Sequence, residues 1–291
     1  MIKHQQSKPQ LLDRSMFQPA LPPRRSDSHK GSFGSVAIIG GDESMVGAVL
    51  LAARAALLAG AGRVYAAMLT QNAPVVDMHY PEIMLRSPSA LTQLSQLDCV
   101  VIGPGLGQSS AAITQLEFWL TQPQALVIDA DALNLIAAHP HLADLVKSRH
   151  AETVITPHAG EAARLLRSHA ENIQKNRTAC ALELASTLNL ACVLKGAGTI
   201  CAFKDGTCFV NTTGNPALAV GGTGDVLSGV IASLIAQGLS AFDAAKLAVY
   251  VHGAAADMLV ARGIGPVGVT ASEVGLEVRN VINTLNQVIE L

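Results

Sequence analysis

The stretch NPALAVGGTGD, residues 215–225, places three glycines and a threonine directly before an aspartate, and the apolar segment 226–236 follows. Glycines permit positive φ and leave backbone N–H groups uncovered, so a ligand can approach the main chain closely. A helix beginning at Asp225 would direct its free N–H groups and positive dipole end at the same place, which predicts a phosphate site. A Gly-rich turn capped by an N-terminal aspartate explains the same residues without a ligand.

The carboxylate of Asp225 needs a role in that turn, because an acid beside a phosphate repels it. It can take a proton from a substrate hydroxyl, or it can hold a metal ion. The turn alone leaves both roles open.

The composition predicts a folded chain with a substantial core. The chain has 291 residues, of which 49% are hydrophobic and 14% charged, which suits one large α/β domain or two small ones. A net charge of −2 without a long basic run argues against nucleic acid as the main partner. The five cysteines form no C-x-x-C pair and are expected to be small core residues in a reducing cytoplasm.

No segment is predicted to be a secretory signal or a membrane span. Residues 1–28 form a polar N-terminal extension that lacks an apolar core, and residues 29–291 read as a single domain. Segments 45–62 and 217–239 approach membrane-span length. Arg54 interrupts the first, and two glycines with Asp225 interrupt the second, so we expect both to be buried helices.

Short β-branched runs alternate with Ala- and Leu-rich stretches, which predicts a parallel sheet with helices on both faces. Several strands end in polar or Gly-rich turns, and ligands of such sheets bind outside the carboxyl ends of the strands. The expected strands are 36–39, 64–67, 99–102, 126–128, 154–155 and 191–194, with an antiparallel hairpin over 199–203 and 207–210. The expected helices are 46–59, 162–166, 225–237, 241–261 and 270–287.

The turns after these strands carry residues that suit a ligand, and each also has an ordinary explanation. Glu161 would sit in the first turn of a helix, where capping alone accounts for a carboxylate, and His158 could be a hydrogen-bonded turn residue. Lys195 with its following glycine can present an ammonium and bare backbone to a phosphate, or it can be a solvated lysine in a turn. Asp129 and Asp131 flank a sharp turn that Asx hydrogen bonding partly explains.

Taken together and in order, these blocks resemble a known family. The chain carries HKGSFG (29–34), GG (40–41), GA (47–48), GPGLG (103–107), DADALN (129–134), TPHAGE (156–161), KG (195–196), NTTGN (211–215) and GGTGD (221–225). Over residues 29–260 this order is similar to the ADP-dependent NAD(P)H-hydrate dehydratases of the ribokinase-like superfamily. HKGSFG and TPHAGE are typical of that branch, whereas GGTGD indicates only the superfamily. The resemblance implies a three-layer α/β/α domain with a central, mostly parallel sheet.

The resemblance also implies an activity and its partners. A lyase would dehydrate (6S)-NADHX or NADPHX back to NADH or NADPH, with Mg²⁺ and with ADP, or ATP, as the co-substrate; ADP would yield AMP and phosphate. It further implies a homo-oligomer, a tetramer by analogy with the family. Many relatives carry an epimerase domain, and only about 28 residues precede the dehydratase-like part here, so a separate epimerase is expected.

By position, the resemblance makes Asp225 the catalytic base that deprotonates the attacking hydroxyl. The pattern of related kinases has asparagine where this chain has His158, so Glu161 is expected to reach a metal through water. The substrate positions are Ala48, Gly105, His158 and Asp225, and the nucleotide positions are Lys195, Gly196, Ala197, Gly198, Thr199, Gly222, Thr223 and Gly224.

Two other functions were weighed. A vitamin-precursor kinase, such as a hydroxyethylthiazole kinase, would share the nucleotide end of the site but has no need of the blocks at 29–34 and 156–161. A catalytically idle nucleotide-binding regulator would be expected to lose the acid of GGTGD, and Asp225 is present.

Overall fold

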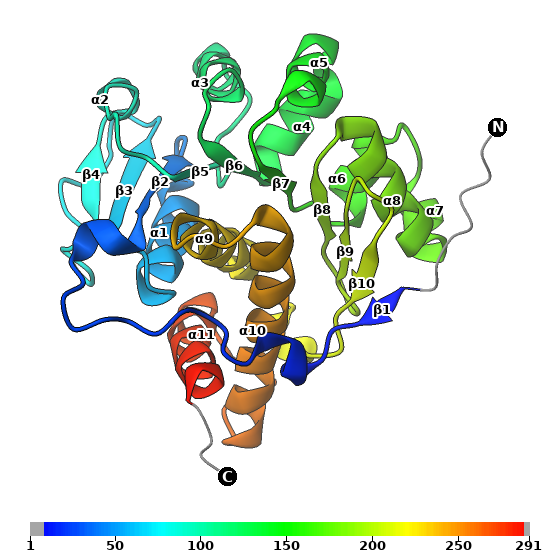
Figure 1. The fold of residues 1–291 in the computed structure, drawn as a ribbon. Coiled ribbons are helices and arrows are strands. Elements are labelled where there is room, and N and C mark those ends of the chain that lie inside the picture. The colour runs from blue at the N-terminus through cyan, green and yellow to red at the C-terminus, as the bar shows by residue number, and fades with distance from the viewer. Residues whose placement is uncertain (1–8, 288–291) are drawn as a thin grey trace.

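A ten-stranded sheet between two layers of helices forms the fold in the computed structural model, which describes residues 9–287 (Figure 1). All neighbouring strands from β8 to β4 are parallel, and β9 pairs antiparallel with both β8 and β10. In spatial order the strands are β1 (Gln10–Leu11), β10 (Cys208–Val210), β9 (Ile200–Ala202), β8 (Ala191–Leu194), β7 (Thr153–Ile155), β6 (Ala125–Ile128), β5 (Cys99–Ile102), β2 (Ser35–Gly40), β3 (Arg63–Met68) and β4 (Met84–Arg86).

Helices cover both faces of the sheet, so its central strands are apolar on both sides and every residue of β2, β5 and β8 is buried. One face carries α1 (Val46–Leu58), α9 (Thr223–Ala236), α10 (Ala241–Ala261) and α11 (Ala271–Asn286). The other carries α3 (Ser110–Leu120), α4 (Ala130–Ala138), α5 (Pro140–Ser148), α6 (Ala159–Leu165), α7 (Ala170–Lys175) and α8 (Arg177–Leu188). A short α2 (Pro88–Leu91) follows β4.

The predicted mostly parallel α/β/α fold is confirmed, and most of the predicted elements occupy their expected places. The strand 99–102 and the helix 241–261 have the predicted bounds, and the hairpin of β9 and β10 is antiparallel as expected. All five cysteines are buried free thiols. By length and composition α10 could cross a membrane, but 61% of its apolar window is buried inside the domain.

The N-terminal segment lies on the domain. Leu12 and Phe17 are buried, and β1 extends the sheet by pairing with β10. The Phe17 ring lies 5.0 Å from the ring of Tyr250 on α10. The polar extension expected for residues 1–28 therefore packs against the core from residue 10 onward, while residues 1–8 lie outside the described part.

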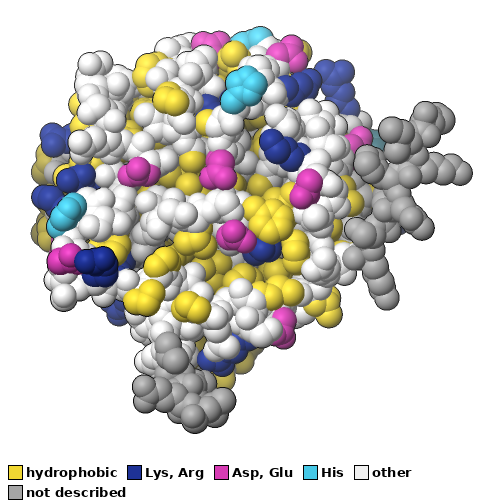
Figure 2. Space-filling view, viewed as in Figure 1, with side chains coloured by type: hydrophobic (Ala, Val, Ile, Leu, Met, Phe, Trp, Pro, Cys, Tyr) yellow, Lys and Arg dark blue, Asp and Glu magenta, His cyan; other side chains and the backbone are white. Residues whose placement is uncertain are grey.

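Charged and apolar side chains are intermixed on the surface. Figure 2 shows charged side chains scattered over one face, with apolar side chains between them. Val75 and Met78 are 94% and 84% exposed. Their loop is held by Arg54, which donates to both oxygens of the buried Asp77 at 2.7 and 2.8 Å. The predicted homo-oligomer stays a prediction.

Helix α9 lies close to α1 because α9 carries a glycine at their contact. A Cβ at Gly229 would lie 2.1 Å from the carbonyl oxygen of Ala52, so no other residue fits without a backbone shift. Gly275 on α11 is a contrasting case, since the nearest atom to its Cβ would be Val226 Cγ1 at 3.9 Å.

We expect Gly229→Ala to lower the free energy of unfolding by roughly 1–3 kcal/mol, the usual cost of overpacking a core. Gly275→Ala is the matched control, and it should be neutral or stabilising by up to about 1 kcal/mol because alanine favours a helix. Urea denaturation of both variants measures the difference. Equal stability of the two would contradict the close contact between α1 and α9.

Candidate active site

The candidate site follows the carboxyl ends of five neighbouring parallel strands. In spatial order these are β8, β7, β6, β5 and β2, and the segments after them carry, respectively, Lys195, His158, Asp129, Gly105 and Ala48. This is the edge of an α/β sheet at which ligands bind. The sequence predicted this edge, and the structure shows that its strands are direct neighbours.

The N-terminus of α9 points at the same edge. Gly222 caps the helix with a φ of +93°, a left-handed conformation that favours glycine. The helix begins at Thr223, two residues before the predicted start, and the amide of Val226 donates to the carbonyl of Gly222 at 3.0 Å. The N–H groups of residues 223–225 therefore precede the intrahelical ladder and remain available to an anion.

A cavity of about 450 Å³ opens beside this helix end. The predicted nucleotide residues Lys195 to Thr199, together with Thr223 and Gly224, lie along its wall, whereas Gly222 does not. The structure thus brings two predicted parts of a nucleotide site together. Residues that the sequence analysis did not assign complete the wall: Asn211, Thr212, Thr213, Gly214, Asn215, Pro216, Leu218, Ala219, Leu227, Val249, His252 and Gly253.

Helix α10 holds the 211–215 loop in place along that cavity. Asp257 accepts the amide of Gly214 and the side-chain Nδ2 of Asn215, both at 2.8 Å. A Cβ at Gly253 would lie 2.3 Å from Thr213 Oγ1, so the loop rests directly on the helix backbone. The block NTTGN (211–215) was identified from the sequence, but the hydrogen bonds that hold it come from Asp257, about 40 positions further along the chain.

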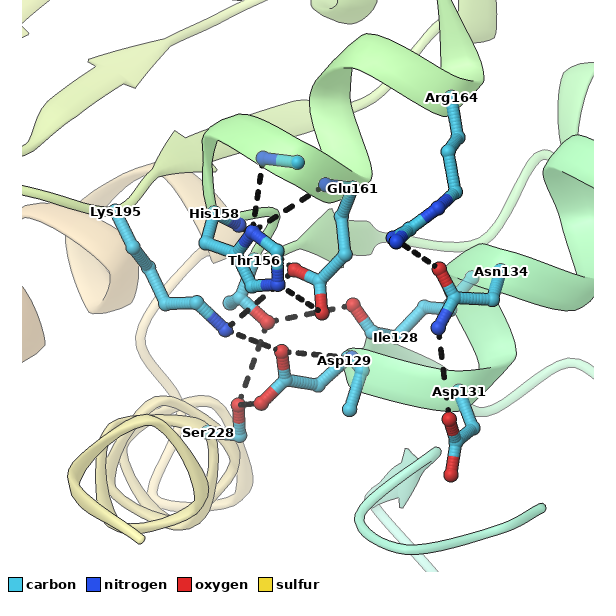
Figure 3. Close-up of polar contacts among 12 residues, drawn as sticks. Ile128, Asp129, Asp131, Asn134, Thr156, His158, Glu161, Arg164, Lys195 and Ser228 are labelled. Atoms are coloured by element: carbon cyan, nitrogen blue, oxygen red, sulfur yellow. Dashed lines mark hydrogen bonds and ion pairs between the residues drawn. The ribbon is translucent and has the colours of Figure 1, made fainter. Parts of the chain in front are cut away.

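A buried cluster of ionisable groups occupies the middle of the edge (Figure 3). The ammonium of Lys195 lies 2.6 Å from Asp129 Oδ1 and 3.9 Å from Glu161 Oε2. Asp129 is fully buried, and its other oxygen accepts the hydroxyl of Ser228 at 2.7 Å. These contacts could not be predicted from the sequence, because they join residues from four separate elements.

His158 and Glu161 cap α6 and also face the cluster. His158 Nδ1 accepts the amides of Gly160 and Glu161 at 2.9 and 3.3 Å, and Glu161 Oε2 accepts the amide of His158 at 2.7 Å. This reciprocal arrangement is a capping box, so capping accounts for both residue types. The Glu161 carboxylate is nevertheless buried within reach of Lys195, which places it at the site as well.

Burial sets the ionisation of the cluster. Burial, aided by the negative charge of Asp129 and opposed by Lys195, raises the pKa of Asp225 to about 7. Burial is also the main cause that raises the pKa of Glu161. Burial works against the charged form of Lys195, but the charges of Asp129 and Glu161 outweigh it and raise the pKa of Lys195. A carboxyl with a pKa near neutrality suits a general base.

Two of the four predicted substrate positions, Ala48 and Gly105, lie at the other end of the edge, whereas His158 and Asp225 lie at the charged cluster. A Cβ at Gly105 would lie 3.5 Å from the Cβ of Ala48, so these two positions adjoin. The Gly105 carbonyl accepts the amide of Asp42 at 2.7 Å, and Asp131 Oδ2 accepts the amide of Gly107 at 3.0 Å. The cavity lies beside the end of β8, and Gly105 and Ala48 follow β5 and β2. Asp129 and Glu161 follow β6 and β7, which lie between those strands, so these two carboxylates stand between the cavity and the Ala48–Gly105 pair.

The cluster suits a cation that a bound ligand helps to hold. In residues 9–287 no three His, Cys, Asp or Glu side chains are placed to hold a metal ion by themselves. Yet Asp129, Glu161 and Asp225 surround the single ammonium of Lys195, so carboxylates outnumber cations in a buried place. A divalent ion bound together with a phosphate-bearing ligand, with Glu161 as its nearest protein group through water, would offset that excess.

Comparison with known proteins agrees with this geometry. The sequence profile of the NAD(P)H-hydrate dehydratase family matches residues 36–277. The chain is 37% identical to the ADP-dependent (S)-NAD(P)H-hydrate dehydratase of Neisseria meningitidis, over 97% of this chain and 96% of that protein. It is 40% identical to the bifunctional NAD(P)H-hydrate repair enzyme Nnr of Escherichia coli, over 96% of this chain but only 53% of that protein.

Solved structures give the same result. The ADP/ATP-dependent NAD(P)H-hydrate dehydratase of Bacillus subtilis, co-crystallised with ATP and Mg²⁺, superposes with a TM-score of 0.84 at 30% identity and covers 95% of this chain and 99% of its own. A hydroxyethylthiazole kinase from Pyrococcus horikoshii superposes with a TM-score of 0.60 at 18% identity, over 89% of this chain and 91% of its own, which shows a shared fold alone.

The pKa of Asp225 predicts how stability depends on pH. Its folded value of about 7 lies above the ordinary 3.8, so between these values the folded state holds a proton that the unfolded state releases. The free energy of unfolding should therefore fall as pH rises from about 4 to 7, and above pH 7 it should show no further loss from Asp225. We expect Asp225→Asn to raise the free energy of unfolding at pH 8, on the order of 2–4 kcal/mol, and to change it little near pH 4.

Urea denaturation at the two pH values, without nucleotide or divalent cation, measures this difference. If the wild type is as stable as the variant at pH 8, ionised Asp225 does not destabilise the folded protein, and its pKa is not raised as described.

Proposed function

Because the chain belongs to the NAD(P)H-hydrate dehydratase family, we propose that it dehydrates (6S)-NADHX and NADPHX to NADH and NADPH while ADP becomes AMP and phosphate. The observation that carries this proposal is the position of Asp225. Its carboxylate lies in the first turn of α9, directly after Thr223 and Gly224 on the cavity wall, and near enough to Asp129 and Lys195 for their charges to act on it. That is where a base must lie to act between a nucleotide and a second substrate.

The proposed reaction follows from that position. Asp225 takes the proton of the hydroxyl on the hydrated nicotinamide ring, and the oxygen attacks the terminal phosphorus of ADP, so AMP leaves. The free amides of Thr223 and Gly224 stabilise the charge on the phosphoryl oxygens. The ring C–O bond then breaks, phosphate leaves with the hydroxyl oxygen, and loss of a ring proton restores the reduced nicotinamide. Phosphorylation thereby turns a poor leaving group into a good one.

The cavity is proposed to hold the nucleotide, with the predicted positions Lys195–Thr199, Thr223 and Gly224 on its wall. We propose ADP as the co-substrate because the Neisseria relative carries ADP dependence in its name. Mg²⁺ is proposed as well, held by the phosphates and through water by Glu161, where it would neutralise phosphate charge. His158, Ala48 and Gly105 are proposed to contact the hydrated cofactor.

A kinase of the same superfamily remains the second candidate, since the fold is shared. The identity of 37% over nearly the full length of a dehydratase favours dehydration. The chain spans about half the length of its bifunctional relatives, so a separate epimerase stays a prediction, as do a homo-oligomer and a cytoplasmic location.

The direct test uses enzymatically prepared NADPHX and follows the return of reduced-nicotinamide absorbance, first with ADP and then with ATP. We expect turnover with ADP. A flat trace with both nucleotides would exclude the dehydratase and favour the kinase.

In the same assay Asp225→Asn should lower turnover by about 10²–10⁴-fold, the usual contribution of a general base. Nucleotide binding, measured by calorimetry with ADP, should be largely kept because the 195–199 and 211–215 loops are unchanged. Turnover near the wild-type level would remove Asp225 from the role of base.

A further inference from the structure

The carboxylate of Asp129 ties together the elements that form the site. It follows β6 and is fully buried; its Oδ1 accepts from the Lys195 ammonium at 2.6 Å and from the amide of Ala130 at 2.8 Å. Its Oδ2 accepts from the Ser228 hydroxyl on α9 at 2.7 Å. Figure 3 shows Asp129 between these two partners. One side chain thus links the ends of β6 and β8 to the helix that carries Asp225.

The ammonium of Lys195 is held at the first turn of α9. Its Nζ lies 3.3 Å from the point that a Cβ at Gly224 would occupy, so it stands directly over that residue. It also lies 3.9 Å from Glu161 Oε2. The free amides of α9 and this fixed positive charge therefore converge on one place, the end of the cavity next to Asp225.

We propose that Asp129 is a positioning residue that fixes the Lys195 ammonium beside Gly224, where the ammonium stabilises the phosphoryl group during its transfer. This inference rests on the proposed function and assigns a role in the chemical step to Lys195. The proposal has a second part: the hydrogen bond from Ser228 to the same carboxylate fixes α9 about one turn after Asp225.

A lysine needs such a partner here for two reasons. Its four-carbon side chain has many rotamers, and fixing one costs up to about 2 kcal/mol of side-chain entropy unless a strong contact holds it. Glu161 and Asp225 also compete for the ammonium. Without Asp129 the ammonium would be free to pair with either of them, and pairing with Asp225 would weaken the base.

The nucleotide loop has a separate support, which makes the inference testable. Arg177 on α8 donates to the carbonyl of Leu194 at 3.0 Å, and its guanidinium lies against Gly196. The backbone of residues 196–199 therefore does not depend on Asp129. A defect in Asp129 should change the rate of the chemical step and leave the KM for ADP nearly unchanged.

The test is a double-mutant cycle of Asp129→Asn, Lys195→Met and the combined variant, with kcat and the KM for ADP measured with NADPHX. Each single change should lower kcat by about 10²–10³-fold, the range seen on removing one donor to a transition-state charge. The combined variant should match Lys195→Met within about threefold, because Asp129 acts through Lys195. The KM for ADP should change by less than about threefold in Asp129→Asn.

The matched control is Glu277→Gln, which removes a buried carboxylate paired with Arg262 outside the site. It should lose stability but keep kcat and both KM values. Ser228→Ala serves where Asp129→Asn does not fold: it should lower kcat by about 3–30-fold at an unchanged KM for ADP, since one hydrogen bond to a charged group is lost.

Losses that multiply in the combined variant, or a raised KM for ADP at unchanged kcat, would overturn the positioning role. A wild-type kcat in Ser228→Ala would overturn the second part of the proposal, that Asp129 fixes α9 through Ser228. The turnover of NADPHX by the wild-type protein is measured first. If there is none, the proposed function fails and this inference fails with it. If the wild type is active, the variants test the inference alone.

Discussion

The N-terminus of α9, held against the carboxyl edge of a parallel sheet, is the feature on which the rest of the site depends. Gly222 permits the left-handed turn that starts the helix, and Gly229 lets the helix approach α1 within backbone contact. The free amides then face the ends of neighbouring strands, and each strand supplies one ligand-facing segment. The order of the strands in the sheet therefore sets the order of the proposed subsites, from the cavity beside β8, proposed to hold the nucleotide, to the Ala48–Gly105 pair after β2 and β5.

The second constraint is an imbalance of buried charge. Asp129, Glu161 and Asp225 lie around one ammonium, and burial raises the pKa of both Glu161 and Asp225. Such an arrangement costs stability, because charged groups lose hydration without full compensation. It is the expected property of a site whose charge is completed by its ligands, which in the proposed function are a nucleotide and Mg²⁺. Burial, aided by the charge of Asp129, raises the pKa of Asp225 to about 7, which suits a group that takes a proton near neutral pH.

The sheet and the principal site segments were predictable from the sequence because their signals are local. An apolar run followed by a Gly-rich turn marks a buried strand and its functional end, and GGTGD before an apolar helix marks an anion site. The Asp129–Ser228 and Lys195–Asp129 contacts were not predictable, since they join residues 99 and 66 positions apart. The packed N-terminal segment was also missed, because its apolar residues stand only in pairs, such as Leu11–Leu12 and Met16–Phe17, without helical or strand periodicity.

If a phosphoryl-transfer site performs the dehydration, the hydroxyl of the hydrated nicotinamide must leave with the phosphate. NADPHX labelled with heavy oxygen in that hydroxyl distinguishes this route from direct loss of water. After one turnover with ADP, mass spectrometry of the inorganic phosphate should find the label there. Label that appears in water, with unlabelled phosphate released from ADP, would contradict the transfer of phosphate to the hydroxyl and with it the role assigned to Asp225.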